Sequence, residues 1–185
     1  MKRFAIAALL AAVASGTSWL WLRGYHIEPK HGTRLAAVGG VDIYYHREGI
    51  ERRGQFGLEY ECVEFVNRWL AVHGHRNLSR TGHALSYFNE AKAKGLVPYN
   101  NGGSVKPQHG DVIVFESSQH DFGHVGIVVE VNSDSVLVAQ QNATMRAAFL
   151  AKPMPLERFA LADSEGKWTV APRRPLACIG WARRK

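Results

Sequence analysis

The chain has 185 residues, of which 46% are hydrophobic and 21% are charged. This length suits one globular domain with an appendage, and the hydrophobic content excludes general disorder. Lys and Arg outnumber Asp and Glu by 23 to 16, a formal net charge of +7 that excludes an acidic tail protein. A basic surface attracts polyanions such as anionic lipid, nucleic acid or envelope polymers. Two cysteines are too few for a disulfide-stapled scaffold or a four-cysteine zinc module.

The first 22 residues have the pattern of an export signal. The basic pair Lys2-Arg3 precedes an apolar run over Phe4–Ala14, and residues 12–14 form an A-x-A-like cleavage site. The uncharged stretch nevertheless continues to Leu22, which gives it about the length that spans a bilayer. We therefore expect residues 1–22 to be either a cleaved signal peptide or an N-terminal membrane anchor. Both alternatives place the rest of the chain in the periplasm or outside the cell, and the second attaches it to the inner membrane.

Helical patterns occupy the middle of the chain. Residues 23–39, rich in Gly, His and charge, are expected to be a linker, and one domain is expected over residues 40–185. Apolar side chains recur at a helical period from Glu59 to His73, which predicts an amphipathic helix. A weaker helix is predicted over Gly82–Lys94, and a loop over Pro98–Gln108.

The second half of the chain predicts strands. They are expected over residues 112–115, 123–131 and 136–141, with a hairpin turn at residues 132–135. Two more extended pieces are expected near residues 168–170 and 177–181. Helices followed by antiparallel strands indicate an α+β fold, in which N-terminal helices pack on an antiparallel sheet.

Cysteine, histidine and amide residues lie where such a fold would bring them together. Cys62 starts the amphipathic helix, where free N–H groups and the helix dipole favour a thiolate and should lower its pKa toward neutral. His124, at the start of a hairpin strand, is the candidate base, and the amides that follow the partner strand are candidates to orient it. A two-residue turn places Gln141 on the face of His124, whereas a turn one residue longer or shorter places Gln140 and Asn142 there. All three amides stay candidates.

Five segments together carry a family resemblance: Tyr60–Leu70 (YECVEFVNRWL), Gly110–Phe115 (GDVIVF), Gly123–Val128 (GHVGIV), Ala139–Asn142 (AQQN) and Ile179–Trp181 (IGW). They resemble the CHAP domain, the cysteine, histidine-dependent amidohydrolase/peptidase branch of the papain-like NlpC/P60 superfamily. They are also similar to the amidase half of glutathionylspermidine synthetase/amidase. The resemblance runs from about residue 40 to the C-terminus, so it implies a papain-like, NlpC/P60-type fold for that domain.

The resemblance implies a role for each site residue. Cys62 matches the nucleophile, His124 the general base, Gln140 the third position that is often Glu, and Asn142 an Asn two residues later. Relatives commonly have Gln before the nucleophile, as part of the oxyanion site, whereas this chain has Glu61. The charge of Glu61 would oppose a thiolate, and neutral Gln140 cannot stabilise an imidazolium by charge.

The implied reaction is hydrolysis of peptidoglycan amide bonds by an exported enzyme, through a thioester on Cys62. Two alternatives stay open: an amidase for small conjugates such as glutathionylspermidine, and a catalytically dead wall-binding module suggested by Glu61 and Gln140. We expect no cofactor, no nucleic-acid partner and a monomer. A metal at His120 and His124 is not expected, because the segment between them has the composition of a loop, and neither is a disulfide between Cys62 and Cys178.

Overall fold

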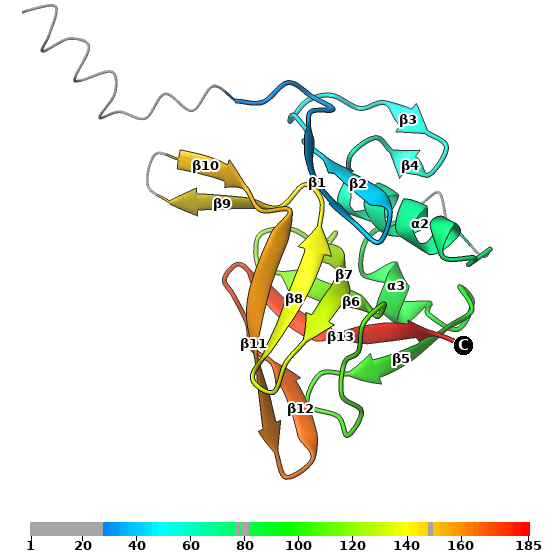
Figure 1. Ribbon diagram of the computed structural model, residues 1–185, viewed down its shortest axis with the longest axis vertical. Coiled ribbons are helices and arrows are strands. Elements are labelled where there is room, and N and C mark those ends of the chain that lie inside the picture. Colours follow the sequence, from blue (N-terminus) through cyan, green and yellow to red (C-terminus); the bar gives the residue numbers. More distant parts are fainter. Residues whose placement is uncertain (1–27, 77, 79–81, 148–149) are drawn as a thin grey trace, which may run out of the picture.

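The computed structural model describes residues 28–76, 78, 82–147 and 150–185 (Figure 1). The expected signal or anchor at residues 1–22 lies outside this part. The described elements are β1 (Arg34–Val38), β2 (Val41–Tyr44), β3 (Arg53–Gly54), β4 (Gly57–Leu58), α2 (Cys62–Val72), α3 (Ser86–Asn89), β5 (Leu96–Asn100), β6 (Val112–Ser117), β7 (His124–Val131), β8 (Ser135–Gln140), β9 (Thr144–Ala147), β10 (Leu150–Pro153), β11 (Leu156–Ser164), β12 (Lys167–Val170) and β13 (Leu176–Arg184). No helix among these residues is long and apolar enough to cross a membrane.

An antiparallel sheet of seven strands, in the order β12-β11-β8-β7-β6-β13-β5, dominates the described part (Figure 1). The loop after β5 bonds to β12 at the other end of this order, because Gly102 N–H donates to Trp168 O at 2.7 Å and Trp168 N–H donates to Gly103 O at 2.8 Å. The sheet is therefore curled, so that the loop after one edge strand bonds to the other edge strand.

Both faces of the central strands are buried. Along β6, Val112 and Val114 join the core beneath α2, which includes Phe65 and Leu70. The alternate residues of β6, such as Phe115, join a second core on the other face. This alternation follows from the period of two along a strand, and burial on both faces explains why the predicted strands are nearly continuous apolar runs.

Of the two predicted helices, the first is confirmed and the second is wrong. The helix predicted over Glu59–His73 is α2 (Cys62–Val72). The helix predicted over Gly82–Lys94 is only the four-residue α3, and turns follow it as far as Gly95. Leu96 must extend to pair with Arg184 in β13, so tertiary pairing overrides the helical preference of the segment.

Strands precede and follow the predicted elements. Two small hairpins, β1–β2 and β3–β4, come before α2, so the described domain does not begin with the helices that the predicted fold places at its N-terminus. β1 lies within residues 23–39, the segment expected to be a linker. β5 includes Pro98, the first residue of the predicted loop, and proline is tolerated there because β5 is the end strand of the sheet. β11 was not predicted, and the site depends on it.

Candidate active site

Cys62 lies at the N-terminus of α2, as predicted. The backbone before it is constrained, because Tyr60 has a φ of 63° and Glu61 is extended at the N-cap. A left-handed conformation is unfavourable for a tyrosine and is common near functional sites. The chain thus enters the helix through a sharp turn that places the thiol at the first helical position.

His124 is the first residue of β7 and is 7% exposed. Gly123 before it has a φ of 67°, and a Cβ there would lie 2.6 Å from Phe115 O. Only glycine fits this turn, which leads the chain directly into His124. The backbone N–H of Val125, the next residue, hydrogen-bonds to Cys62 and thereby lowers the pKa of the thiol. The packing of α2 on β7 therefore brings the cysteine and the start of the histidine strand together, as predicted.

A β-bulge decides which amide orients the histidine. The turn has two residues, as predicted, since Asn132 N–H donates to Ser135 O. The register nevertheless shifts between Val128 and Glu130, so that Gly126 pairs with Gln140. One extra residue in β7 swaps the face of every residue beyond it. Gln140 therefore lies on the face of His124, and its Oε1 is 3.0 Å from His124 Nε2.

The other two amides do different work. Gln141 is buried on the opposite face, where its Nε2 donates to Glu64 Oε2 at 2.8 Å and its Oε1 accepts from the backbone N–H of Tyr44 at 2.8 Å. Asn142 Nδ2 donates to Glu61 Oε2 at 2.9 Å. Gln141 thus joins β8 to α2 and β2, and Asn142 holds the carboxylate next to the candidate nucleophile.

Glu61 contacts a histidine and an amide at the site entrance. Its side chain is 33% exposed, and Oε1 lies 3.5 Å from Nε2 of His46, whose side chain is 10% exposed. Together with the hydrogen bond from Asn142, this contact restricts rotation of the Glu61 carboxylate. Its position beside Cys62 makes it an electrostatic neighbour of the thiol and not a hydrogen-bond donor for an oxyanion.

The resting protonation states differ from the expectation for Cys62. Burial, and secondly the charge of Glu61, raise the pKa of Cys62 to about 12 and outweigh the hydrogen bonds from backbone N–H groups. Burial lowers the pKa of His124 to about 4, opposed by the hydrogen bond with Gln140. The predicted shift of the thiol pKa toward neutral is therefore wrong. At neutral pH the site holds a thiol and a neutral imidazole, which can accept a proton.

A second layer of the site was missed by sequence reasoning. Glu157, on β11, accepts a hydrogen bond from Gln140 Nε2 at 2.7 Å and pairs with Arg173. Along β11 the inward positions are Glu157, Phe159 and Leu161, an alternation that was the only signal for this strand. A glutamate at the first inward position hid that signal, because acidic residues rarely point into a core unless they are paired.

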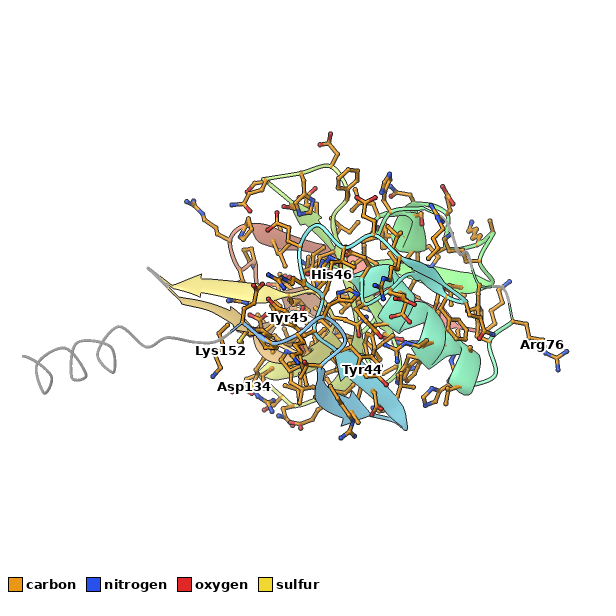
Figure 2. The ribbon with its side chains drawn as sticks, turned by 90° about the horizontal axis from the view of Figure 1, so that it is seen from above. Tyr44, Tyr45, His46, Arg76, Asp134 and Lys152 are labelled. Atoms are coloured by element: carbon orange, nitrogen blue, oxygen red, sulfur yellow. The ribbon has the colours of Figure 1, made fainter. Side chains whose placement is uncertain are left out.

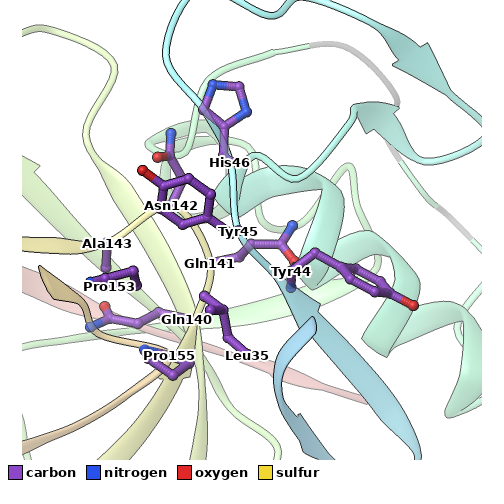
Figure 3. A pocket seen from close by; sticks show the side chains of 10 residues that line it. All are labelled: Leu35, Tyr44, Tyr45, His46, Gln140, Gln141, Asn142, Ala143, Pro153 and Pro155. Carbon is purple, nitrogen blue, oxygen red and sulfur yellow. The ribbon is translucent and has the colours of Figure 1, made fainter. Parts of the chain in front are cut away.

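A hollow of about 230 Å³, partly open to solvent, adjoins the site (Figure 3). It is lined by Gln140 at the end of β8 and Asn142 after it, by Tyr45 and His46 after β2, and by Pro153 at the end of β10, but not by Cys62 or His124. Viewed from above, Tyr45 and His46 run between that hairpin and α2 (Figure 2). The hollow therefore shares Gln140 with the site, and part of its wall comes from Asn142, Ala143, Pro153 and Pro155.

No group of three metal-ligating side chains comes together in the described part of the chain. Cys62 and Cys178 are free thiols, and Cys178 lies on β13 in the second core.

Comparison with known proteins agrees with the residues assembled here. Residues 53–142 match the family model of the CHAP domain, and this range includes Cys62, His124, Gln140 and Asn142. The chain is also similar to trypanothione synthetase of Crithidia fasciculata, with 29% identity over 123 residues. That match covers 62% of this chain and 18% of the relative. The antiparallel sheet with α2 against it is consistent with a papain-like fold. The chain is therefore similar to CHAP domains over residues 53–142, and this similarity indicates an amidase or peptidase.

Proposed function

We propose that this protein is an exported cysteine amidase or endopeptidase that hydrolyses amide bonds of peptidoglycan. The observation that carries the proposal is the meeting of Cys62, at the start of α2, with the strand of buried His124, whose Nε2 contacts Gln140. A thiol, a neutral imidazole and an orienting amide are the groups that acyl transfer needs.

The reaction follows from these protonation states. His124 takes the proton of Cys62 as the sulfur attacks the amide carbonyl carbon, and the oxyanion is held by the backbone N–H of Cys62 and a neighbouring donor. His124 then gives this proton to the leaving nitrogen, so that the C–N bond breaks and a thioester stays on Cys62. His124 next deprotonates a water that attacks the thioester, which releases the acid and restores the thiol.

Peptidoglycan is the substrate that the sequence favours. The N-terminal pattern would place the enzyme beside the wall, and a formal charge of +7 suits an anionic envelope. The hollow at Tyr45, His46 and Asn142 offers polar and aromatic contacts to a peptide next to the scissile bond. Substrate choice would then reside in the segment 142–155 that borders it.

The relative supports a second candidate, an amidase for a small γ-glutamyl or polyamine conjugate. A related sequence occurs in an enzyme named trypanothione synthetase, a name that does not describe a wall hydrolase. The exported N-terminus expected here argues against this alternative. A dead wall-binding module, the third candidate, is favoured only by Glu61 and by the neutral Gln140.

The test is digestion of purified peptidoglycan, and in parallel of glutathionylspermidine, with the full chain. Wild type is compared with Cys62→Ala and with Cys178→Ala, a matched removal of the other thiol, after circular dichroism has shown that each is folded. We expect wall fragments from wild type and Cys178→Ala alone, with masses that identify the bond. Cleavage of the small conjugate alone would support the second candidate, and cleavage of neither the third.

A further inference from the structure

A buried carboxylate stands behind the amide that contacts the histidine. Glu157 is 6% exposed, and its Oε2 accepts from Gln140 Nε2 at 2.7 Å. Arg173 donates to the other carboxylate oxygen. Imidazole, amide, carboxylate and guanidinium thus form one continuous line from His124 to Arg173. Pairing β11 with β8 builds this line, because it sets Glu157 against Val138, two residues before Gln140.

The chemistry of this line fixes where the proton of the imidazole lies. A carboxylate accepts hydrogen bonds and cannot donate, so Gln140 must turn its NH₂ group to Glu157. The carbonyl oxygen of Gln140 then faces His124 Nε2, at 3.0 Å. A carbonyl oxygen also only accepts, so Nε2 must carry the hydrogen. In a neutral imidazole the lone pair is then on Nδ1, the nitrogen that is free to act as a base.

We propose that Glu157 is a positioning residue for this site, which holds Gln140 in one orientation and thereby keeps His124 in the tautomer with Nδ1 as the base. The ion pair with Arg173 keeps Glu157 in its carboxylate form. This inference rests on the proposed function for its effect on catalysis, but the tautomer of His124 is a property of the resting protein and can be measured without any substrate.

The same line also compensates for the neutral side chain at position 140. When His124 accepts a proton, the amide alone offers only a dipole. The charge of Glu157 lies beyond that dipole and polarises it in the direction that favours the imidazolium, because hydrogen bonds in a chain strengthen one another. Removing the charge should therefore weaken both the orientation and the basicity of His124.

The first experiment reads the tautomer directly, by long-range ¹H–¹⁵N correlation on the full chain near pH 7. We expect the Nε2–H form alone in the wild type and a mixture with the Nδ1–H form in Glu157→Gln, since a glutamine can also donate and lets Gln140 turn over. Glu64→Gln is the matched control, because Glu64 is an equally buried glutamate that binds Gln141 and Arg68. It should leave the His124 spectrum unchanged.

The second experiment is a rescue. Glu157→Gln should lower kcat about 10- to 100-fold with KM within about twofold, as for other outer partners of catalytic groups. Gln140→Glu alone brings two carboxylates into contact and should also lose activity. The double variant Gln140→Glu/Glu157→Gln again has one carboxylate, which now contacts His124 directly. It should recover kcat to within about tenfold of the wild type.

The outcomes separate this inference from the proposed function. A pure Nε2–H tautomer in Glu157→Gln, or a double variant no better than the single ones, would overturn the role of Glu157. If the wild type cleaves nothing, the proposed function fails while the tautomer still decides the inference. If Glu157→Gln is unfolded by circular dichroism, Arg173→Gln takes its place, since that side chain is 38% exposed, and the Nδ1–H form is again expected.

Discussion

Gln140 and Gln141 are neighbours in the sequence, both buried, and each donates to a buried glutamate that pairs with an arginine. They differ in what their oxygen atoms accept. Gln140 accepts from the imidazole of His124, whereas Gln141 accepts from the Tyr44 backbone and from Arg68. The first network therefore ends at a group that can exchange a proton, and the second is closed by groups that cannot.

Residue type alone therefore does not decide the role of a buried amide in this molecule. The same triplet of amide, carboxylate and guanidinium occurs on both faces of β8. The face that meets His124 belongs to the proposed catalytic site, and the other face holds β2, β8 and α2 together. The extra residue between Val128 and Glu130 decides which amide takes which part.

The largest effect is expected when the network of Gln140, His124 and Glu157 is interrupted. Gln140→Leu removes the partner of His124 and leaves Glu157 with a lost hydrogen bond, so the imidazole is free to adopt the wrong tautomer. We expect kcat to fall by about a hundredfold or more, with a smaller change in KM. Steady-state kinetics on released wall fragments measures this. Activity within a few-fold of wild type would show that Gln140 does not orient the base.

Interrupting the network of Gln141, Glu64 and Arg68 should lower the stability of the fold instead. Gln141→Leu leaves the Tyr44 N–H without its partner and removes one hydrogen bond from Glu64, which keeps Arg68. An unsatisfied buried group costs about 1–3 kcal/mol. We expect the free energy of unfolding in urea to fall by several kcal/mol, while the His124 tautomer is retained. A tautomer change in this variant, with stability unaltered, would reverse the roles given to the two amides.

The pH dependence should follow the buried imidazole. Because burial lowers the pKa of His124 to about 4, the base stays neutral well below pH 6 and activity should fall only as the pH approaches 4. The unfolded chain binds this proton near pH 6.5, so the contribution of neutral His124 to stability is present above that pH and lost as the pH falls toward 4. Urea unfolding of the wild type and of His124→Gln between pH 4 and 7 checks this. An equal pH dependence in both would contradict it.

The smallest effect is expected at the thiol. The charge of Glu61 is the second cause, after burial, of the raised pKa of Cys62. Glu61→Gln should therefore lower this pKa and increase the rate of alkylation by iodoacetamide near pH 8, by up to about tenfold for one pKa unit. Glu59→Gln, in the same loop, is the control. A slower reaction in Glu61→Gln would mean that the carboxylate activates the thiol.

The sequence predicts the local elements of the site better than the contacts between distant segments that complete it. α2, the turn at residues 132–135 and the strands β6 to β8 follow from local periodicity. The placement of Cys62 against the strand of His124 is instead expected from the family resemblance. The bulge near Val129 leaves no such pattern, since Val128 and Val129 look alike in an apolar strand. Glu157 is joined to Gln140 only through the pairing of β11 with β8, a contact between distant segments that no local pattern encodes.

The most direct test of the proposed function is to detect the covalent intermediate on Cys62. The full chain is mixed with peptidoglycan fragments, quenched in acid during turnover and digested, and the peptide that contains Cys62 is analysed by mass spectrometry. We expect an acyl adduct on Cys62, which is absent from Cys62→Ala and retained in Cys178→Ala. Release of fragments by folded Cys62→Ala would contradict it.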